Sequence, residues 1–250
     1  MILSQQQIEE IGASVTQDFT RFLNKNSLEE RFKTRETPID FLAKNYLGLH
    51  VSYARLSEDG SICGLTAYVD TEYEIEERGI RRTVQLKQNE IILDRSFLDY
   101  RNRQQLEGKR RFTLAHECAH QILFQLESDE TRKTHIMGYA ERKAFSLRDL
   151  KTREDWNEWQ ANALGAALLL PQIEVSQEMW KLKKGYPLIS YEGIFAYHDR
   201  LCLSLFCHMF GVSKSAAKIR LRQLGYIIQK PRSEYIDPLD VWDETTCENC

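Results

Sequence analysis

Residues 110–124 read RRFTLAHECAHQILF, and this stretch contains the motif that decides the fold, an HExxH running from His116 to His120. Apolar residues recur around the motif at three- and four-residue steps, which predicts a helix over residues 109–126 with one buried stripe. Histidines four residues apart lie one turn apart on a helix face, so both imidazoles can bind one Zn²⁺ at about 2.0–2.1 Å. We therefore predict that His116 and His120 are metal ligands.

Glu117 lies between the two histidines and projects about 100° around the helix from His116. Zn²⁺ lowers the pKa of a bound water toward about 7, and a carboxylate beside that water can act as a general base. Only six histidines occur in the 250 residues, so this spacing is rare by chance. The motif thus indicates a metal-dependent hydrolase with Glu117 as its catalytic residue.

A hydrolytic zinc site needs a third protein ligand and an open fourth position. The metzincin pattern would place Gly at position 123 and His at position 126, and the two leucines found there exclude it. Residues 156–170 predict a second helix, in which Glu158 lies between two tryptophans and ahead of small residues that allow close helix packing. We rank Glu158 first, which would make the site gluzincin-like. The competing candidates are His135, Glu141 and Asp155.

Two further roles are open at this point. Asn162 lies one turn beyond Glu158, where it could hydrogen-bond a ligand histidine from outside the metal's own ligand set. The group that stabilises the oxyanion is not assigned to the catalytic set; its candidates are His135, Tyr139, Tyr197 and His198.

The rest of the chain predicts an α+β fold with a small antiparallel sheet and several helices. Residues 4–24 form an amphipathic pattern, Pro38 opens a short helix, and residues 173–223 are helical in several pieces. Strand-like segments are interrupted by glycines, and we interpret Gly64 as such a break. The strand at residues 90–94 precedes the motif helix, and we take it as the edge to which a substrate peptide could add.

The charge of the chain is nearly balanced, with 34 Lys+Arg against 37 Asp+Glu and a net charge of −3. Residues 209–232 carry a local charge of +6 and residues 233–250 a local charge of −6. The basic part has the outline of a helix-turn-helix with Lys214, Lys218, Arg220 and Arg222 on its second helix. We expect this face to be solvated or to dock a partner, and we assign no nucleic-acid-binding residue and no direct DNA contact.

Three segments are expected: a zincin-like metallopeptidase domain over 1–185, a helix-turn-helix-like segment over 186–232 and an acidic tail over 233–250. The longest apolar run, residues 163–170, is far shorter than the roughly 20 residues of a membrane-spanning helix. The start of the chain lacks the pattern of a signal peptide. We therefore expect a cytoplasmic protein with no membrane partner and with reduced cysteines.

Two stretches, RRFTLAHECAHQILF and EWQANALGAALLLP (residues 158–171), closely resemble the ImmA/IrrE family of metallo-endopeptidases. Members of that family typically show RFTLAHELGH followed by a helix of the pattern E-x-E-A-N-x-F-A-A-x-L-L-M-P. Residues 38–51 and 85–94 also fit the upstream region of the family, and residues 210–225 fit its closing helices more loosely. The chain departs from the usual pattern at Ala119, Phe124, Gln160 and Leu170, and none of these is a proposed ligand.

The resemblance implies Zn²⁺, with Mn²⁺ as the alternative ion, held by His116, His120 and Glu158 beside the catalytic Glu117. It implies a compact zincin followed by a helix-turn-helix-like bundle. It also implies an intracellular endopeptidase whose protein substrate is a helix-turn-helix repressor or antitoxin of the same cell. The competing interpretation is a non-catalytic regulatory or DNA-binding protein that retains the zincin fold.

Overall fold

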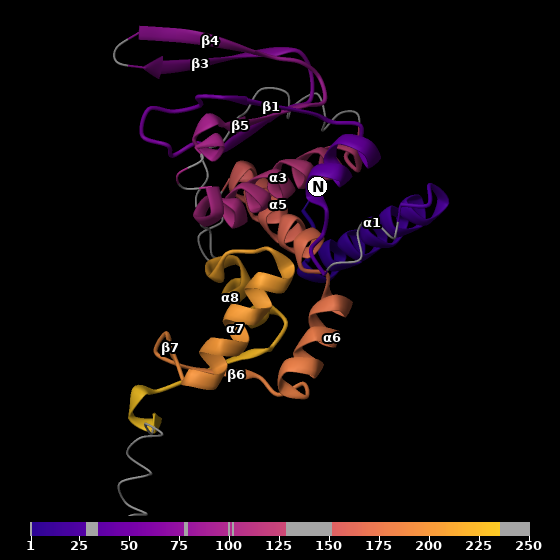
Figure 1. The fold of residues 1–250 in the computed structure, drawn as a ribbon. Helices are drawn as coiled ribbons and strands as arrows, with labels where there is room; N and C mark the ends of the chain where they lie inside the picture. The colour runs from indigo at the N-terminus through magenta and orange to yellow at the C-terminus, as the bar shows by residue number, and fades with distance from the viewer. Residues whose placement is uncertain are drawn as a thin grey trace, which may run out of the picture. The chain divides into compact units, whose positions relative to one another are not determined.

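A computed structural model describes residues 2–28, 35–77, 80–99, 101, 103–128 and 152–235. The chain divides into two compact units, Met1–Gln172 with Phe210–Ser213 and Ile173–Met209 with Lys214–Cys250. Each unit combines helices with a small sheet, which confirms the predicted α+β class (Figure 1). None of the helices in the described ranges is long and apolar enough to cross a membrane.

The first unit has a three-stranded sheet in the order β1 (His50–Ala54), β5 (Glu90–Asp94), β2 (Gly64–Ala67). β2 runs antiparallel to β5, whereas β1 runs parallel to it. The sheet is therefore mixed, whereas the sequence predicted an antiparallel sheet. The expectation that residues 90–94 form an edge is wrong, because β5 pairs on both sides. All five of its residues are buried, as is typical of a central strand.

A hairpin of β3 (Thr71–Glu77) and β4 (Ile80–Leu86) follows β2 in the chain and precedes β5. Tyr73 and Val84 of this hairpin pack against a buried cluster on one face of the sheet. Side chains alternate between the faces of a strand, so the opposite face of β2 carries Gly64 and Thr66. The cluster consists of Leu56, Leu65, Ala67, Leu86 and Ile92.

That opposite face packs on α3 (Arg103–Gln125), and α5 (Arg153–Leu169) and then α1 (Gln5–Lys25) follow as further layers (Figure 1). Small residues allow these helices to pack closely. Gly12 of α1 has no side chain, and a methyl group added to it would lie only 2.9 Å from the Cβ of Ala167 in α5. Phe41 and Tyr46 hold α2 (Ile39–Phe41) and a π-helical turn (Leu42–Tyr46) against α1 by ring contacts with its phenylalanines. The core between the helices includes Ile8, Ala119, Leu123, Ala161, Leu164 and Leu168.

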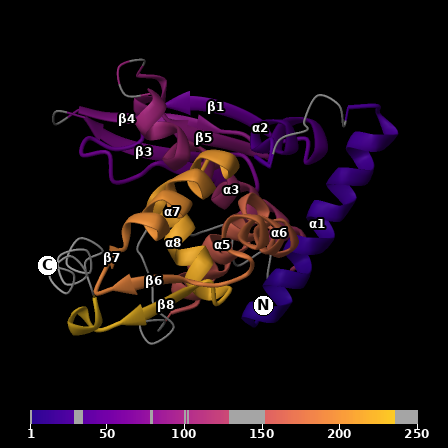
Figure 2. The same ribbon diagram turned by 60° about the horizontal axis from the view of Figure 1, so that its bottom comes forward.

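The second unit contains α6 (Gln172–Lys183), α7 (Tyr197–Phe210) and α8 (Lys214–Gln223). The first residue of α6 and the last residue of α7 belong to the first unit. The second unit also contains a sheet in the order β7 (Ile194–Phe195), β6 (Leu188–Tyr191), β8 (Ile227–Lys230), in which β6 lies beside β8 (Figure 2). Asp199 joins its parts, since its carboxylate accepts hydrogen bonds from Lys183 Nζ at 2.6 Å and from the backbone N–H of Ile189 at 2.8 Å. The sequence analysis expected only helices over residues 173–223 and missed β6 and β7. Short 3₁₀ turns occur in the two units at Arg95–Leu98 and Arg232–Glu234.

The basic side chains of α8 do not form one exposed face. Arg220 is fully buried, and Lys218 lies with its Nζ 5.2 Å from the centre of the Phe195 ring. Lys214 and Arg222 are exposed. The four-residue face drawn from the sequence is therefore wrong at Arg220. The acidic tail expected over 233–250 lies outside the described residues from position 236 onward.

Candidate metal centre

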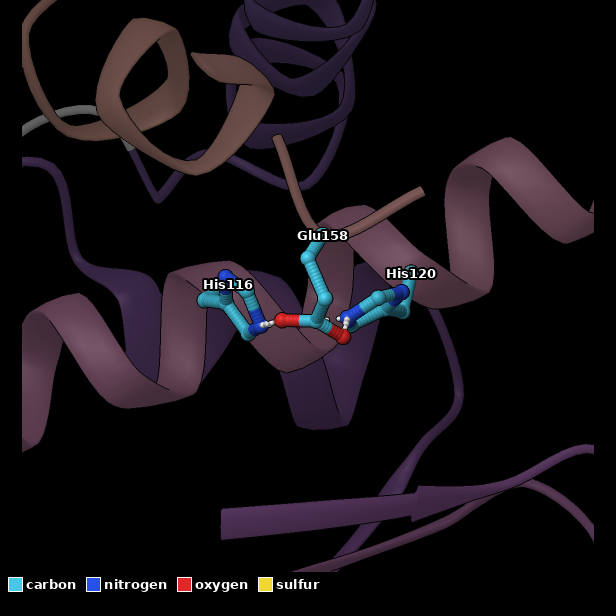
Figure 3. Close-up of side chains that lie close together, drawn as sticks. All are labelled: His116, His120 and Glu158. Carbon is cyan, nitrogen blue, oxygen red and sulfur yellow. Dashed lines mark hydrogen bonds and ion pairs between the residues drawn. The ribbon is translucent and has the colours of Figure 1, made fainter. Parts of the chain in front are cut away.

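The three predicted ligands come together at the crossing of α3 and α5. His116 and His120 lie one turn apart on α3, and Glu158 reaches between them from α5 (Figure 3). The side chains of His116 and Glu158 are 2% and 7% exposed, and that of His120 is 13% exposed. A carboxylate this buried is not the solvated residue that an ordinary helix would carry.

The ligand atoms of the three residues lie close together. Nε2 of His116 lies 3.0 Å from Nε2 of His120 and 3.3 Å from Oε2 of Glu158, whereas Nε2 of His120 lies 3.1 Å from the other carboxylate oxygen, Oε1. A tetrahedral ion with bonds of about 2.0–2.1 Å holds neighbouring ligand atoms about 3.3 Å apart. The two imidazoles and the carboxylate are therefore spaced to hold one small divalent ion such as Zn²⁺.

The electrostatics of Glu158 agree with this fit. Burial by itself would raise the pKa of this carboxyl, but hydrogen bonds and charge interactions with His116 and His120 outweigh burial and lower it well below its usual range. The carboxylate is therefore ionised, as a metal ligand must be. Within the described part of the chain, its buried Oε2 accepts no hydrogen bond of good geometry, so it retains a lone pair for an ion.

Gly165 explains how α5 comes close enough to deliver Glu158. A methyl group on Gly165 would lie 3.0 Å from the backbone N of His116 and 3.1 Å from its Cα. Gly165 follows Glu158 by seven residues, which places both on the same side of α5. This confirms the expectation that small residues on the second helix permit a close approach to the motif helix.

Glu117 points to a different face of α3, toward the sheet. It is 3% exposed, and its Oε1 would lie 2.9 Å from a methyl group on Gly64 of β2. The residues of the motif thus lie on two faces of α3, with the histidines facing α5 and the glutamate facing β2.

The comparison with known protein families matches a part of the chain that contains these residues. Residues 100–222, close to half of the chain, match the family model of a peptidase described as the IrrE N-terminal-like domain. Residues 100–222 belong to the ImmA/IrrE family. This peptidase family implies a metallopeptidase that acts on a protein. No curated protein matches the chain significantly.

Several other candidates in this ImmA/IrrE peptidase have different surroundings. Asp155 completes a capping box at the start of α5, where its Oδ2 accepts a hydrogen bond from the backbone N–H of Thr152 at 2.9 Å. Asn162 is half-buried on α5, one turn beyond Glu158, and its contact with a ligand histidine stays a prediction. Tyr197 and His198 lie on α7 in the second unit. His135, Tyr139 and Glu141 lie outside the described residues.

Sequence reasoning missed three residues that surround Glu117: Gly64, Thr113 and Gln121. Thr113 and Gln121 lie four residues before and after Glu117, so helical spacing alone could have found them. Gly64 was interpreted as a strand break, but it is the first residue of β2. Its role becomes visible only when α3 is packed against the strand.

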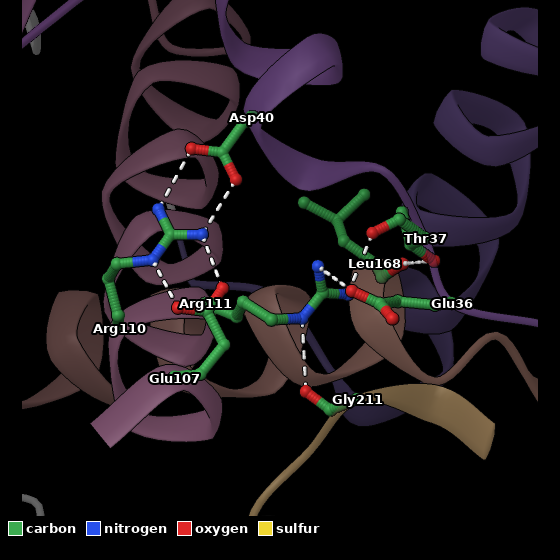
Figure 4. Close-up of polar contacts among 8 residues, drawn as sticks. All are labelled: Glu36, Thr37, Asp40, Glu107, Arg110, Arg111, Leu168 and Gly211. Carbon is green, nitrogen blue, oxygen red and sulfur yellow. Dashed lines mark hydrogen bonds and ion pairs between the residues drawn. The ribbon is translucent and has the colours of Figure 1, made fainter. Parts of the chain in front are cut away.

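Two arginines before the motif fix the position of α3 (Figure 4). Arg110 makes a paired contact with Asp40, with both nitrogen–oxygen distances at 2.8 Å, and a second contact with Glu107. Although burial would raise the pKa of Asp40, the hydrogen bonds and charge of Arg110 lower it. The pair ties α3 to α2, because Asp40 lies on that short helix.

Arg111 is the more buried of the two, at 3% exposure. Its guanidinium pairs with the carboxylate of Glu36 and donates hydrogen bonds to the carbonyl oxygens of Thr37 at 2.8 Å and Gly211 at 3.0 Å (Figure 4). Three chain segments of the first unit thus meet at one side chain, five residues before His116. This fixes the rotation of α3 about its own axis, on which the direction of both ligand histidines depends.

Proposed function

We propose that the protein is a zinc-dependent endopeptidase of gluzincin type, with His116, His120 and Glu158 as metal ligands and Glu117 as general base. The observation that carries the proposal is the buried cluster of two imidazoles and one carboxylate, whose neighbouring nitrogen and oxygen atoms lie 3.0–3.3 Å apart. The peptidase domain, expected over residues 1–185, corresponds in this proposal to the first compact unit, where all four residues lie.

In this proposal the bound metal supplies a polarised water and a positive charge beside the scissile carbonyl. Glu117 accepts a proton from the attacking water at its carboxylate and passes it to the amide nitrogen as the C–N bond breaks. The products are a new carboxylate and a new amine, so one water is consumed for each bond. Burial of Glu117 against β2 excludes bulk water from the base and fixes its direction.

The substrate we propose is one specific protein, a helix-turn-helix repressor or antitoxin. Family membership supports a protein substrate, and the resemblance of the motif helices supports this class. β2 is an outer strand of its sheet beside Glu117. The carbonyl oxygens of Cys63 and Ala67 accept hydrogen bonds from the backbone N–H groups of Asp94 and Asn89, so the odd-numbered residues of this strand face β5. The backbone N–H and C=O groups of the even-numbered residues between them, Gly64 and Thr66, therefore point away from β5. An extended peptide can pair with such groups, so β2 replaces β5 as the proposed edge.

The deciding experiment compares Glu117→Gln with wild type and with Glu107→Gln, the same change on an outer position of the same helix. Purified proteins are assayed for metal by plasma mass spectrometry and for cleavage of fluorescein-labelled casein and of each small helix-turn-helix protein encoded beside this gene. We expect Glu117→Gln to keep about one equivalent of metal and to lose cleavage by at least about 100-fold, the usual contribution of a general base. Glu107→Gln should keep both. Equal cleavage by Glu117→Gln and wild type would contradict the role of Glu117 as general base, and no cleavage by wild type would favour a non-catalytic protein.

The substrate is tested by co-expression with each small helix-turn-helix protein encoded beside this gene. Intact-mass spectrometry should find two fragments whose masses sum to the parent mass plus one water. The same co-expression with Glu117→Gln should leave the parent intact. An intact parent with active wild-type enzyme for every neighbouring candidate would contradict the proposed substrate while leaving the peptidase assignment in place.

A further inference from the structure

One face of α3 is devoted to β2 and carries no metal ligand. Thr113, Glu117 and Gln121 follow one another at four-residue intervals on this face, and all three are at least 95% buried. The two ligand histidines face α5 instead. The face toward β2 therefore has one catalytic candidate with a buried polar neighbour one turn to either side.

Gly64 lies directly over the middle of this face. A methyl group on it would lie 2.8 Å from Thr113 Cγ2, 2.9 Å from Glu117 Oε1 and 3.2 Å from Glu117 Cγ. Gly64 is paired with Leu93 in the sheet and does not belong to the residues with positive φ. Its backbone conformation is thus open to any amino acid, and what the position requires is empty space.

Gln121 fixes the other end of the same strand. Its side-chain amide donates hydrogen bonds to Thr66 Oγ1 at 2.7 Å and to the carbonyl of Ala67 at 2.9 Å, and all of these atoms belong to buried residues. A buried amide with two good acceptors resists sliding, because breaking either bond leaves a polar group unsatisfied. β2 is therefore held in register against α3 by Gln121 and lies in contact with Glu117 through Gly64.

We propose that Gly64 is a positioning residue for the proposed peptidase reaction: with β2 held by Gln121, its bare backbone forms the wall that sets where the carboxylate of Glu117 lies. The inference rests on the proposed function of Glu117 as general base. A general base works within about 2.6–3.2 Å of the proton that it removes. A Cβ at position 64 must stand about 3.4 Å or more from the carboxylate oxygen, so it displaces that oxygen by about 0.5 Å.

The test uses the full-length, metal-loaded protein and the variant Gly64→Ala. We expect kcat to fall about 10–100-fold for the casein or helix-turn-helix substrate that wild type cleaves, because displacements of this order misplace a reacting group. KM should stay within about twofold and metal content near one equivalent, since neither the ligands nor the backbone groups of β2 are changed. The crystal structure of the variant should show the Glu117 carboxylate moved away from position 64.

Two further variants separate positioning from loss of packing. Gly64→Ala with Thr113→Ser removes the methyl that the new Cβ would meet at 2.8 Å but leaves the contact with Glu117. It should regain thermal stability and not kcat. Ile92→Val lies on β5 in the cluster on the opposite face of the sheet, and it should lower stability by about 1 kcal/mol and leave kcat unchanged.

Three results would overturn the inference: wild-type kcat in Gly64→Ala, recovery of kcat on adding Thr113→Ser, or an unmoved carboxylate in the crystal structure. Failure of the proposed function gives a different pattern. If wild-type protein binds metal but cleaves neither casein nor any neighbouring helix-turn-helix protein, the proposed activity fails. The position of the Glu117 carboxylate in Gly64→Ala then still decides whether Gly64 sets it.

Discussion

Replacing Gly165 with alanine tests whether the close approach of α5 to α3 creates the metal centre. The new methyl would lie 3.0 Å from the backbone N of His116, 3.1 Å from its Cα and 3.2 Å from the carbonyl carbon of Ala115. All three are backbone atoms of a packed helix, so they cannot rotate away. Ordinary contact begins near 3.4 Å, so α5 must retreat by about 0.4 Å.

This retreat should weaken metal binding more than folding. Overpacking costs about 1–3 kcal/mol, and alanine regains about 1 kcal/mol over glycine within a helix, which leaves a net loss of about 0–2 kcal/mol. Metal–ligand distances tolerate only about 0.2 Å, and Glu158 moves with α5. We therefore expect Zn²⁺ affinity to fall about 10–100-fold, as for residues that orient metal ligands.

The assay is a competition titration of Zn²⁺ against a chromophoric chelator, with thermal unfolding measured on the same samples. Gly12→Ala is the matched control, because its methyl would lie 2.9 Å from the Cβ of Ala167, on the face of α5 that packs against α1, and would leave the contact of Gly165 with α3 unchanged. The control should lose stability and keep its affinity. Wild-type affinity in Gly165→Ala would refute the reasoning that this contact sets the spacing of the three proposed ligands.

Three further predictions concern the support of the motif helix and sheet. Asp40→Asn should cost about 1 kcal/mol at pH 7 in urea unfolding, a value discounted for the partial exposure of Asp40. The folded pKa of Asp40 is lowered, so this difference should be complete above pH of about 4 and should shrink at lower pH; a constant difference would contradict it. Arg111→Met should cost about 2–3 kcal/mol, or about 4–12 °C in Tm, because a buried cation with three oxygen partners is lost; an unchanged Tm would show that these contacts are not needed. Ile91→Pro should abolish the folded near-UV circular dichroism, because β5 is central; a folded variant would mean that the strand order is wrong.

The clustering of His116, His120 and Glu158 could be predicted because it depends on patterns that are local in sequence. The spacing of His116 and His120 is fixed by the helix that contains them, and the burial of Glu158 follows from its apolar surroundings. Both positions depend on helical periodicity, which is visible in one dimension. The capping box of Asp155 also depends only on residues close to it in sequence. Asp155 was a candidate ligand only because a carboxylate can bind a metal ion.

The order of the strands could not be predicted in the same way. β5 is buried at all five positions and its three middle residues are apolar, but which strands pair on its two sides depends on long-range packing. In the sequence, Gly64 looks like a residue that interrupts a strand. Only the folded structure shows that it lies within β2 in close contact with Glu117. Arg220 looks like an exposed cation in the sequence, and only the folded structure shows that it is buried.

The central claim is that His116, His120 and Glu158 hold one metal ion at which peptide bonds are hydrolysed. The most direct measurement is the metal content of purified wild-type protein and of Glu158→Ala after dialysis against Zn²⁺ and removal of free ions. We predict about one equivalent of Zn²⁺ in wild type and less than a tenth of that in Glu158→Ala, with both proteins folded. Equal zinc content in the two proteins, or none in wild type, would contradict the account.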